Sequence, residues 1–258
     1  MTAPALEGRN LSKQFGGLRA INDVSFEVPE GSLTALIGPN GAGKTTLFNL
    51  ITNLFPPDTG EVRFFGKPLA NLGLSDIAGL GLLRTFQTAR VFPGMTALEN
   101  VLVGAHRQVR ASALRQMLWL GGARREERHL VERAEALLEL VGLAAFRDTA
   151  ATSLPMGAQK LIEVCRALMA RPRLLLLDEP AAGLNDAETA ELAALLRAVR
   201  ESGITIMVVE HNMSLVMNVA DHVIVLDLGS FIARGTPAEI QRDQRVIEAY
   251  LGLEHGAI

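Results

Sequence analysis

One nine-residue segment constrains the fold of this 258-residue chain more than any other. Residues 38–46 read GPNGAGKTT, which fits the pattern G-x-x-x-x-G-K-[ST]. Glycines in such a loop let backbone N–H groups curl around phosphate oxygens, and a following helix points its positive end toward them. At the residue frequencies of this chain, a chance match is expected only about three times in a thousand. Because a short apolar run (31–38) precedes the lysine and a helix-like TTLFNLITNL follows it, the pattern predicts a strand, a phosphate-binding loop and a helix.

Two side chains of this loop have distinct expected roles. Lys44 would reach the β- and γ-phosphates of a nucleoside triphosphate, and the Thr45 hydroxyl would hold Mg²⁺. The expected cofactor-binding residues of the loop are Gly38, Pro39, Asn40, Gly41, Ala42, Gly43, Lys44, Thr45 and Thr46.

Further apolar runs predict the rest of an α/β fold. Residues 174–177 (LLLL), 204–209 and 223–226 read as buried strands, and they alternate with helical segments such as 187–201. This alternation is typical of a parallel sheet covered on both faces, with its ligand at the carboxyl ends of the strands. A short strand at 61–65, after the turn signal PPDTG, is expected to pair with N-terminal strands such as 24–28 in an antiparallel layer.

The middle of the chain differs from both ends. Residues 98–104, 111–120 and 124–141 have helical periodicity, so we expect an inserted helical lobe there. Thr236, followed by Pro237 and Glu239, fits the start of a short C-terminal helix. The expected division is a core at 1–87 and 166–235, a helical lobe at 88–165 and a C-terminal extension at 236–258.

Polar residues follow two of the predicted core strands directly. Asp178 and Glu179 come after 174–177, and Glu210 and His211 come after 204–209. Asp178 would hold the metal through water, and Glu179 would orient and deprotonate an attacking water. His211 would contact the γ-phosphate. Glu179, His211 and Lys44 are therefore the expected catalytic residues.

Charge and composition exclude several classes of protein. With 25 basic and 28 acidic residues the net charge is −3, so no global positive field favours nucleic acid as a partner. No uncharged stretch approaches the ~20 residues needed to span a bilayer, and the N-terminus does not resemble a secretory leader. One cysteine, Cys165, permits no intrachain disulfide, which fits a reducing cytoplasm. Seven arginines between 107 and 133, interleaved with glutamates, favour a solvated helix face over a membrane-docking surface.

Six segments occur in the order found in ATP-binding-cassette (ABC) ATPases, which the chain resembles along nearly its whole length. They are GPNGAGKTT at 38–46, RTFQ at 84–87, LPMGAQ at 154–159, RLLLLDEP at 173–180, AAGLND at 181–186 and VVEH at 208–211. The resemblance implies a P-loop NTPase with a RecA-like parallel sheet, an antiparallel β layer and an inserted helical lobe. It also implies ATP and Mg²⁺ as cofactors and hydrolysis of ATP between two cassettes.

The same resemblance assigns roles to further residues. Gln87 is implied as the Q-loop glutamine that senses Mg²⁺ and the transmembrane partner. Phe15, in KQFGGLRAI, matches the aromatic residue that stacks on adenine, with a core phenylalanine as the alternative. Residues 183–186 would form the D-loop that crosses to the other cassette. The segment 154–159, here called the signature segment, implies cofactor contacts from Leu154, Met156, Gly157 and Ala158.

The signature segment departs from the usual L-S-G-G-Q. Pro155 and Ala158 stand in the places of the serine and the glutamine. The loss of a hydroxyl and an N–H at Pro155 should weaken the grip on the γ-phosphate of the opposite cassette. Gly157 still permits close backbone approach, and the helix through 162–168 still directs its positive end at the phosphate. A degenerate, mainly structural cassette therefore stays an alternative.

Several longer stretches narrow the resemblance. RTFQTARVFPGMTALENVLVGAH at 84–106, the helical insertion up to Gly142 and the terminal VIEAYLG look like the first ATP-binding subunit of branched-chain amino-acid importers. That likeness implies a peripheral protein on the cytoplasmic face of the inner membrane. Its implied partners are a second cassette (itself or a paralogue), transmembrane permease subunits and, indirectly, a periplasmic solute-binding protein. Cassettes for urea import or lipopolysaccharide export, and a non-transport ABC ATPase acting on DNA or the ribosome, are the alternatives.

Overall fold

The computed structural model describes residues 4–85, 91–108 and 121–251. It divides into two compact units, each considered by itself. The first comprises residues 1–84, 173–182 and 196–258, and the second comprises 85–172 and 183–195. The division expected from the sequence, with a separate C-terminal extension from 236, stays a prediction.

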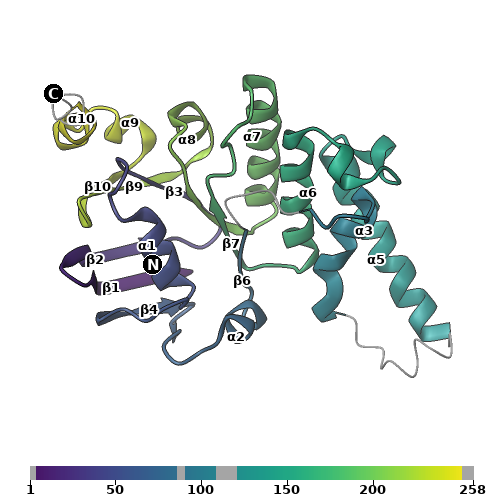
Figure 1. Cartoon of the computed structure of the whole chain (residues 1–258), viewed down its shortest axis with the longest axis horizontal. Coiled ribbons are helices and arrows are strands. Elements are labelled where there is room, and N and C mark those ends of the chain that lie inside the picture. The colour runs from purple at the N-terminus through teal and green to yellow at the C-terminus, as the bar shows by residue number, and fades with distance from the viewer. Residues whose placement is uncertain (1–3, 86–90, 109–120, 252–258) are drawn as a thin grey trace. The chain divides into compact units, whose positions relative to one another are not determined.

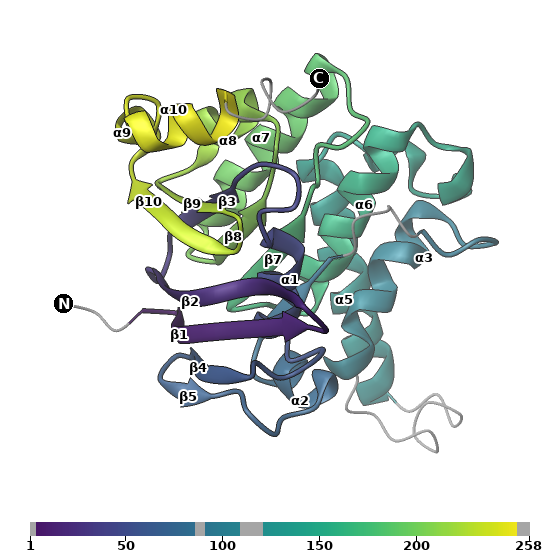
Figure 2. The same cartoon turned by 60° about the vertical axis from the view of Figure 1, so that its left-hand side comes forward.

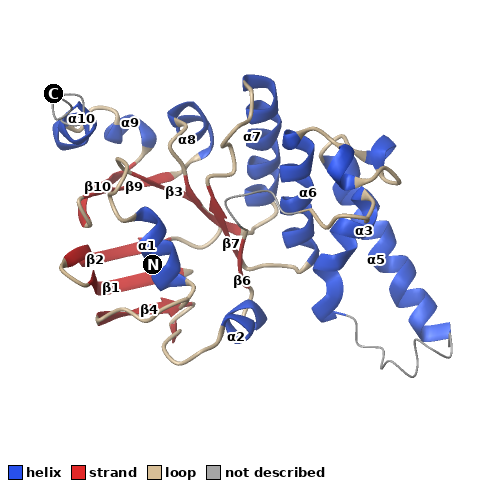
Figure 3. Cartoon of the chain, viewed as in Figure 1, coloured by secondary structure: helices blue, strands red, loops and turns tan. Residues whose placement is uncertain are grey.

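A mixed six-stranded sheet forms the centre of the first unit (Figure 3). Its order is β10-β9-β3-β8-β7-β6, in which only the pair β10–β9 is antiparallel. The strands are β3 (Leu33–Ile37), β6 (Leu82–Arg84), β7 (Leu174–Asp178), β8 (Thr205–Val209), β9 (His222–Asp227) and β10 (Ser230–Gly235). All residues of β3, β7 and β8 are buried, as continuous apolar runs require in a sheet covered on both faces. The parallel core predicted from the sequence is confirmed.

A second, antiparallel sheet also lies within the first unit. Its order is β2-β1-β4-β5, formed by β1 (Leu6–Phe15), β2 (Leu18–Val28), β4 (Thr59–Phe64) and β5 (Lys67–Pro68). The pairing Leu6↔Phe64 joins β1 to β4. The expected antiparallel layer is thus present.

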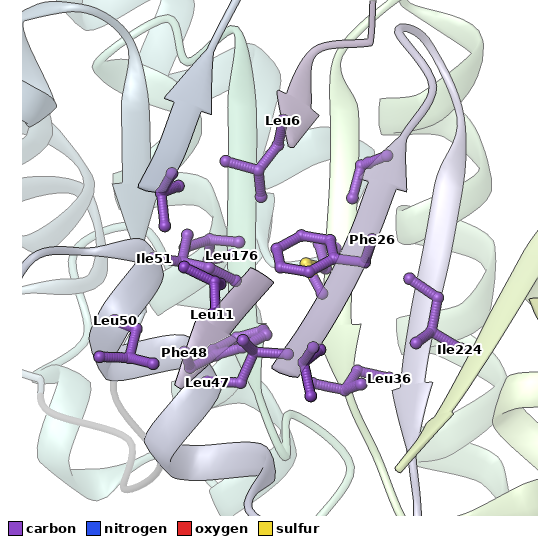
Figure 4. Packing of buried hydrophobic residues seen from close by; sticks show 14 of the residues in the cluster. Leu6, Leu11, Phe26, Leu36, Leu47, Phe48, Leu50, Ile51, Leu176 and Ile224 are labelled. Atoms are coloured by element: carbon purple, nitrogen blue, oxygen red, sulfur yellow. The ribbon is translucent and has the colours of Figure 1, made fainter. Parts of the chain in front are cut away.

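Helix α1 (Lys44–Ile51) lies in the core that the two sheets share (Figure 4). Its buried Leu47 and Phe48 belong to one apolar cluster with Leu11 and Phe26 of the antiparallel sheet and Leu176 of the parallel sheet. This packing holds the N-terminal end of α1 at a fixed place against the end of β3.

Shorter helices complete the first unit. They are α2 (Leu74–Gly79), α8 (Met213–Val219), α9 (Pro237–Ile240) and α10 (Gln244–Leu251). Helix α9 begins with the capping box expected from the sequence: the Thr236 side chain accepts from the Glu239 N–H, and the Glu239 side chain accepts in return. Helix α7 (Asp186–Glu201) starts in the second unit and ends in the first.

The second unit is helical in its described part, as predicted (Figures 1 and 2). It contains α3 (Ala97–Leu102), η1 (Val103–Gln108), α5 (Gly121–Leu140), η2 (Ala144–Phe146), η3 (Ala151–Ser153) and α6 (Met156–Met169). The guanidinium of Arg133 on α5 donates to the carbonyls of Leu168 and Met169 and so satisfies the C-terminal end of α6. The expected helix at 111–120 lies outside the described residues. Within the part of the chain that is described, no helix has the length and apolar character to cross a bilayer.

Candidate nucleotide site

The phosphate loop connects the end of β3 to the start of α1, as the sequence predicts. Gly38 and Gly43 have φ angles of 150° and 95°. A Cβ atom would stand 2.1 Å from the Leu226 carbonyl oxygen at Gly38, and 2.5 Å from the Ala20 carbonyl oxygen at Gly43. At Gly41, by contrast, no atom lies within 4 Å of such a Cβ. The loop is therefore packed tightly at both ends and open at its middle, which is the shape of a cradle for phosphate.

The ammonium of Lys44 is bonded to its own loop. Nζ donates to the carbonyl oxygens of Gly38, at 2.6 Å, and Pro39, at 2.8 Å. Burial lowers the pKa of Lys44, and the negative charge of Glu179 raises it back in part. The cation is thus desolvated and interacts electrostatically with Glu179, which follows β7. Asn40 and Thr45 are exposed on the loop and the first turn of α1.

The two acids predicted from the sequence lie at the end of β7. Asp178 is only 4% exposed, and its Oδ2 accepts from the Arg84 guanidinium at 2.7 Å. Glu179 has φ of 48°, in the left-handed region that side-chain-bearing residues rarely adopt. Its N–H donates to the Val209 carbonyl of β8 at 2.9 Å. This turn directs the two consecutive carboxylates differently, one into an ion pair and one toward the loop lysine.

His211 follows β8 and lies beside Glu179. Its Nδ1 is 3.9 Å from Glu179 Oε2, and 60% of its side chain is exposed. Because β3, β8 and β7 are neighbours in the sheet, their carboxyl ends bring Lys44, His211 and Glu179 together. The geometry expected of the three candidate catalytic residues is present, and their roles stay predictions.

Phe15 ends β1 and is 46% exposed, so the alternative of a core phenylalanine is not supported. Its ring contacts the edge of Phe55 at a centroid distance of 5.3 Å, and Lys13 Nζ lies 5.7 Å from the Phe15 centroid. An exposed ring held by a second ring is suited to stacking on a base. The adenine contact itself stays a prediction.

The signature segment belongs to the second unit, at the start of α6. Pro155 is the N-cap residue of that helix, with no capping hydrogen bond from a side chain. Gly157 is closely covered, because a Cβ there would stand 2.5 Å from Glu188 Oε1. The side chains of Glu188 and Asn185 each accept from the other residue's N–H, and Asn185 is the neighbour of Asp186 in the expected D-loop.

Of the remaining candidates, Leu154 is buried, Ala158 is partly buried, Met156 is half exposed, and Gln87 lies outside the described residues.

The residues present fit a nucleotide that binds together with Mg²⁺. The described residues contain no cluster of three or more His, Cys, Asp or Glu side chains able to hold a metal. Thr45 and Asp178 supply a hydroxyl and a carboxylate, and Mg²⁺ takes few protein ligands when substrate phosphates and water supply the others. The cradle at Gly41 fits the phosphates of the same ligand.

Two residues beside the site were missed in the sequence. Arg84 binds Asp178 from β6, a strand of three residues that is too short for a periodicity. Glu210 is fully buried and accepts from the N–H groups of Ala181, His211 and Asn212. The signal that could have indicated Glu210 is a charged residue directly after a buried strand. A role was inferred only for the neighbouring His211.

Comparisons with known proteins find full-length relatives and a similar fold. The family model described as ABC transporter matches residues 21–182, and that described as branched-chain amino acid ATP-binding cassette transporter matches residues 232–256. The high-affinity branched-chain amino acid transport ATP-binding protein BraF of Pseudomonas aeruginosa is 44% identical over 98% of this chain and 99% of its own length. LivG of Escherichia coli, of the same description, is 40% identical over the same shares. A solved ATP-binding cassette of an ABC transporter in its ADP conformation superposes with a TM-score of 0.84 at 34% identity, covering 97% of this chain and all of the other.

Proposed function

The chain belongs to the ABC transporter family as an ATP-binding, ATP-hydrolysing cassette, and from that premise we propose which residues carry the reaction and what is transported. The observation that supports the assignment most directly is the convergence of Lys44, Glu179 and His211 at the carboxyl ends of three neighbouring strands.

Lys44 and the loop backbone bind the β- and γ-phosphates. The ammonium is already desolvated on the loop carbonyls, so it exchanges those oxygens for phosphate oxygens. Thr45 and Asp178 would hold Mg²⁺ and Gln87 would contact it, and the bound ion would neutralise charge that develops on the phosphate oxygens.

Glu179 orients a water molecule and accepts its proton, and His211 contacts the γ-phosphate. The 3.9 Å between Glu179 Oε2 and His211 Nδ1 lets both side chains face one reacting centre. Phe15 stacks on the adenine. Leu154, Met156, Gly157 and Ala158 supply contacts to the nucleotide of a second cassette.

We further propose that the solute is a branched-chain amino acid. The names of the full-length relatives and the C-terminal family match at 232–256 support this substrate class. The cassette would pair with itself or a paralogue and act on transmembrane permease subunits at the cytoplasmic face of the membrane. A periplasmic binding protein would deliver the solute.

Glu179→Gln tests the proposed chemistry. The amide keeps the shape of the side chain but cannot accept a proton, so ATP binding should persist while turnover falls by at least about a hundredfold. Gel filtration with ATP should then show a trapped dimer. Turnover near that of the wild type, with only monomer present, would contradict the role of Glu179.

Lys44→Ala tests the proposed nucleotide site. The backbone donors of the loop remain, but the one cation bonded within the loop is lost, so affinity for ATP should fall by at least about tenfold. Calorimetric titration of ATP measures it. Unchanged affinity would mean that the nucleotide binds elsewhere.

Reconstitution with the permease subunits of a branched-chain amino acid importer tests the transport assignment. ATP turnover of the reconstituted complex should rise when a binding protein loaded with leucine, isoleucine or valine is added. Stimulation by urea alone would reassign the solute. Recovery of the chain only with ribosomes or DNA would reject a transport role.

A further inference from the structure

Arg84 of β6 connects two elements of the proposed site, α1 and β7. Its Nη2 donates to Asp178 Oδ2 of β7 at 2.7 Å, and its Nη1 donates to Asn49 Oδ1 of α1 at 2.6 Å. The guanidinium carbon lies 5.6 Å from the ring centroid of Phe48. One side chain from the edge strand β6 therefore contacts both the helix that follows the phosphate loop and the strand that carries the acids.

The pair is buried. The side chains of Arg84 and Asp178 are 20% and 5% exposed, and Arg84 Nε is enclosed without a hydrogen-bond partner among the described residues. An arrangement that leaves one donor of a buried arginine unsatisfied is unfavourable by itself. The orientation of the guanidinium is thus set by its two bonds through Nη1 and Nη2, which a lysine ammonium cannot reproduce at both positions.

The bonds constrain Asp178 in one specific way. Arg84 occupies Oδ2, and no described side chain is bonded to Oδ1. The carboxylate therefore cannot rotate freely and presents one defined oxygen away from the arginine.

We propose that Arg84, anchored by Asn49, is a positioning residue that fixes Asp178 Oδ1 for the hydration shell of nucleotide-bound Mg²⁺. The inference rests on the proposed function, because it takes Asp178 as the metal acid. In this role Arg84 would act through Asp178 and not through a contact of its own with metal or nucleotide. Mg²⁺ arrives chelated by ATP with a net negative charge, so the arginine does not repel the complex as a whole.

The test measures how much Mg²⁺ contributes to ATP binding. In a Glu179→Gln background, which prevents turnover, the dissociation constant of ATP is determined with Mg²⁺ and with EDTA, and the two are expressed as a ratio. Arg84→Gln should lower this Mg²⁺ enhancement by about tenfold, as loss of a residue that orients a metal ligand generally does. The affinity in EDTA should stay within about twofold of the parent, because the phosphate loop is untouched.

Graded variants keep the test informative if Arg84→Gln folds poorly. Asn49→Ala removes the anchor but leaves the ion pair, and Arg84→Lys keeps the charge but cannot bridge both partners. Both should give Mg²⁺ enhancements between those of the parent and Arg84→Gln. Arg173→Gln is the matched control: it removes one positive charge next to the opposite end of β7, where the arginine stacks on Phe65 at 3.4 Å, and should leave the ratio unchanged.

Asp178→Asn separates the proposed metal site from the proposed positioning role of Arg84. If Asp178→Asn lowers the Mg²⁺ enhancement while Arg84→Gln leaves it unchanged or increases it, the positioning role of Arg84 is wrong and the metal site stands. If neither substitution changes it, Asp178 is not the metal acid, and both the metal assignment and the inference about Arg84 are overturned.

Discussion

At the scale of single residues, the thiol of Cys165 links stability to alkaline pH. The side chain is fully buried on α6, and burial raises its pKa from 9.0 to about 12. Above pH 9 the unfolded chain loses this proton while the folded chain keeps it, so the folded state binds more protons and loses stability as pH rises.

The wild type should therefore lose about 2 kcal/mol more of its unfolding free energy than Cys165→Ala between about pH 8 and about pH 10.5. Urea denaturation followed by circular dichroism at a series of pH values measures the two slopes. The comparison cancels the lysines and the tyrosine common to both proteins. Parallel slopes would show that the thiol ionises in the folded state as easily as in the unfolded chain.

The backbone of Glu179 predicts a conflict between stability and activity. Its φ of 48° is unfavourable for any residue with a Cβ. Glu179→Gly should thus be more stable than Glu179→Gln by about 0.5 to 1 kcal/mol, although both lack turnover. Arg171→Gly is the control, because Arg171 has φ of 55° after the end of α6 and should gain similar stability without loss of turnover. Equal stability of the two Glu179 variants would mean that the turn is not strained.

At the scale of elements, Glu210 joins the ends of two strands. Its carboxylate accepts from Ala181, beyond β7, and from His211 and Asn212, beyond β8. Glu210→Gln places an amide NH₂ against at least one of these N–H donors, so the free energy of unfolding should fall by about 1 to 3 kcal/mol. Turnover should fall as well, since Glu179 and His211 lie on the two turns that lose their common anchor.

Urea unfolding and ATP turnover check this prediction together. Glu201→Gln on α7 is the control. Glu201 is exposed, and its ion pair with Arg200 is weak because the two groups are 3.8 Å apart at the surface. It should change neither quantity. A Glu210→Gln variant as stable and active as the wild type would show that the two turns hold their positions independently.

Elements differ in how far the sequence predicts them. Strands β7 and β8 were predictable because each is a continuous apolar run that stops at an acid, and α9 because its cap is entirely local. Strand β6 has three residues, and the partner of its Arg84 lies 94 positions away along the chain. Lys44 and Asp178 were found from local motifs, whereas Arg84 and the three bonds of Glu210 depend on contacts between distant segments, which no local pattern encodes.

At the scale of the whole molecule, Pro155 bears on assembly. Serine at this N-cap position would add a side-chain acceptor for α6 and, in the proposed dimer, a hydroxyl donor for the nucleotide of the other cassette. Pro155→Ser should stabilise the monomer by about 1 kcal/mol and leave its ATP affinity unchanged. In a Glu179→Gln background it should tighten the ATP-bound dimer by roughly tenfold or more, the effect of one hydrogen bond to a charged group.

Sedimentation with ATP measures the dimer constant, and thermal melting without ATP measures the helix effect separately. A more stable monomer with an unchanged or weaker dimer would show that the segment is already adapted to proline at the interface. It would also favour contacts through the backbone of α6 over a side-chain hydroxyl.

The position of β3 within the sheet also determines when this sheet can fold during synthesis of the chain. Its two neighbours, β8 and β9, are formed by residues 205–209 and 222–227, so the strand that leads into the phosphate loop has no partner in its sheet until most of the chain exists. At usual elongation rates, roughly 10 to 35 s separate translation of β3 from that of β8. Until then Leu33–Ile37 is an apolar segment with unpaired edges. Nascent chains that end before β8 should therefore be candidates for chaperone capture, and affinity for ATP should emerge only near the end of translation.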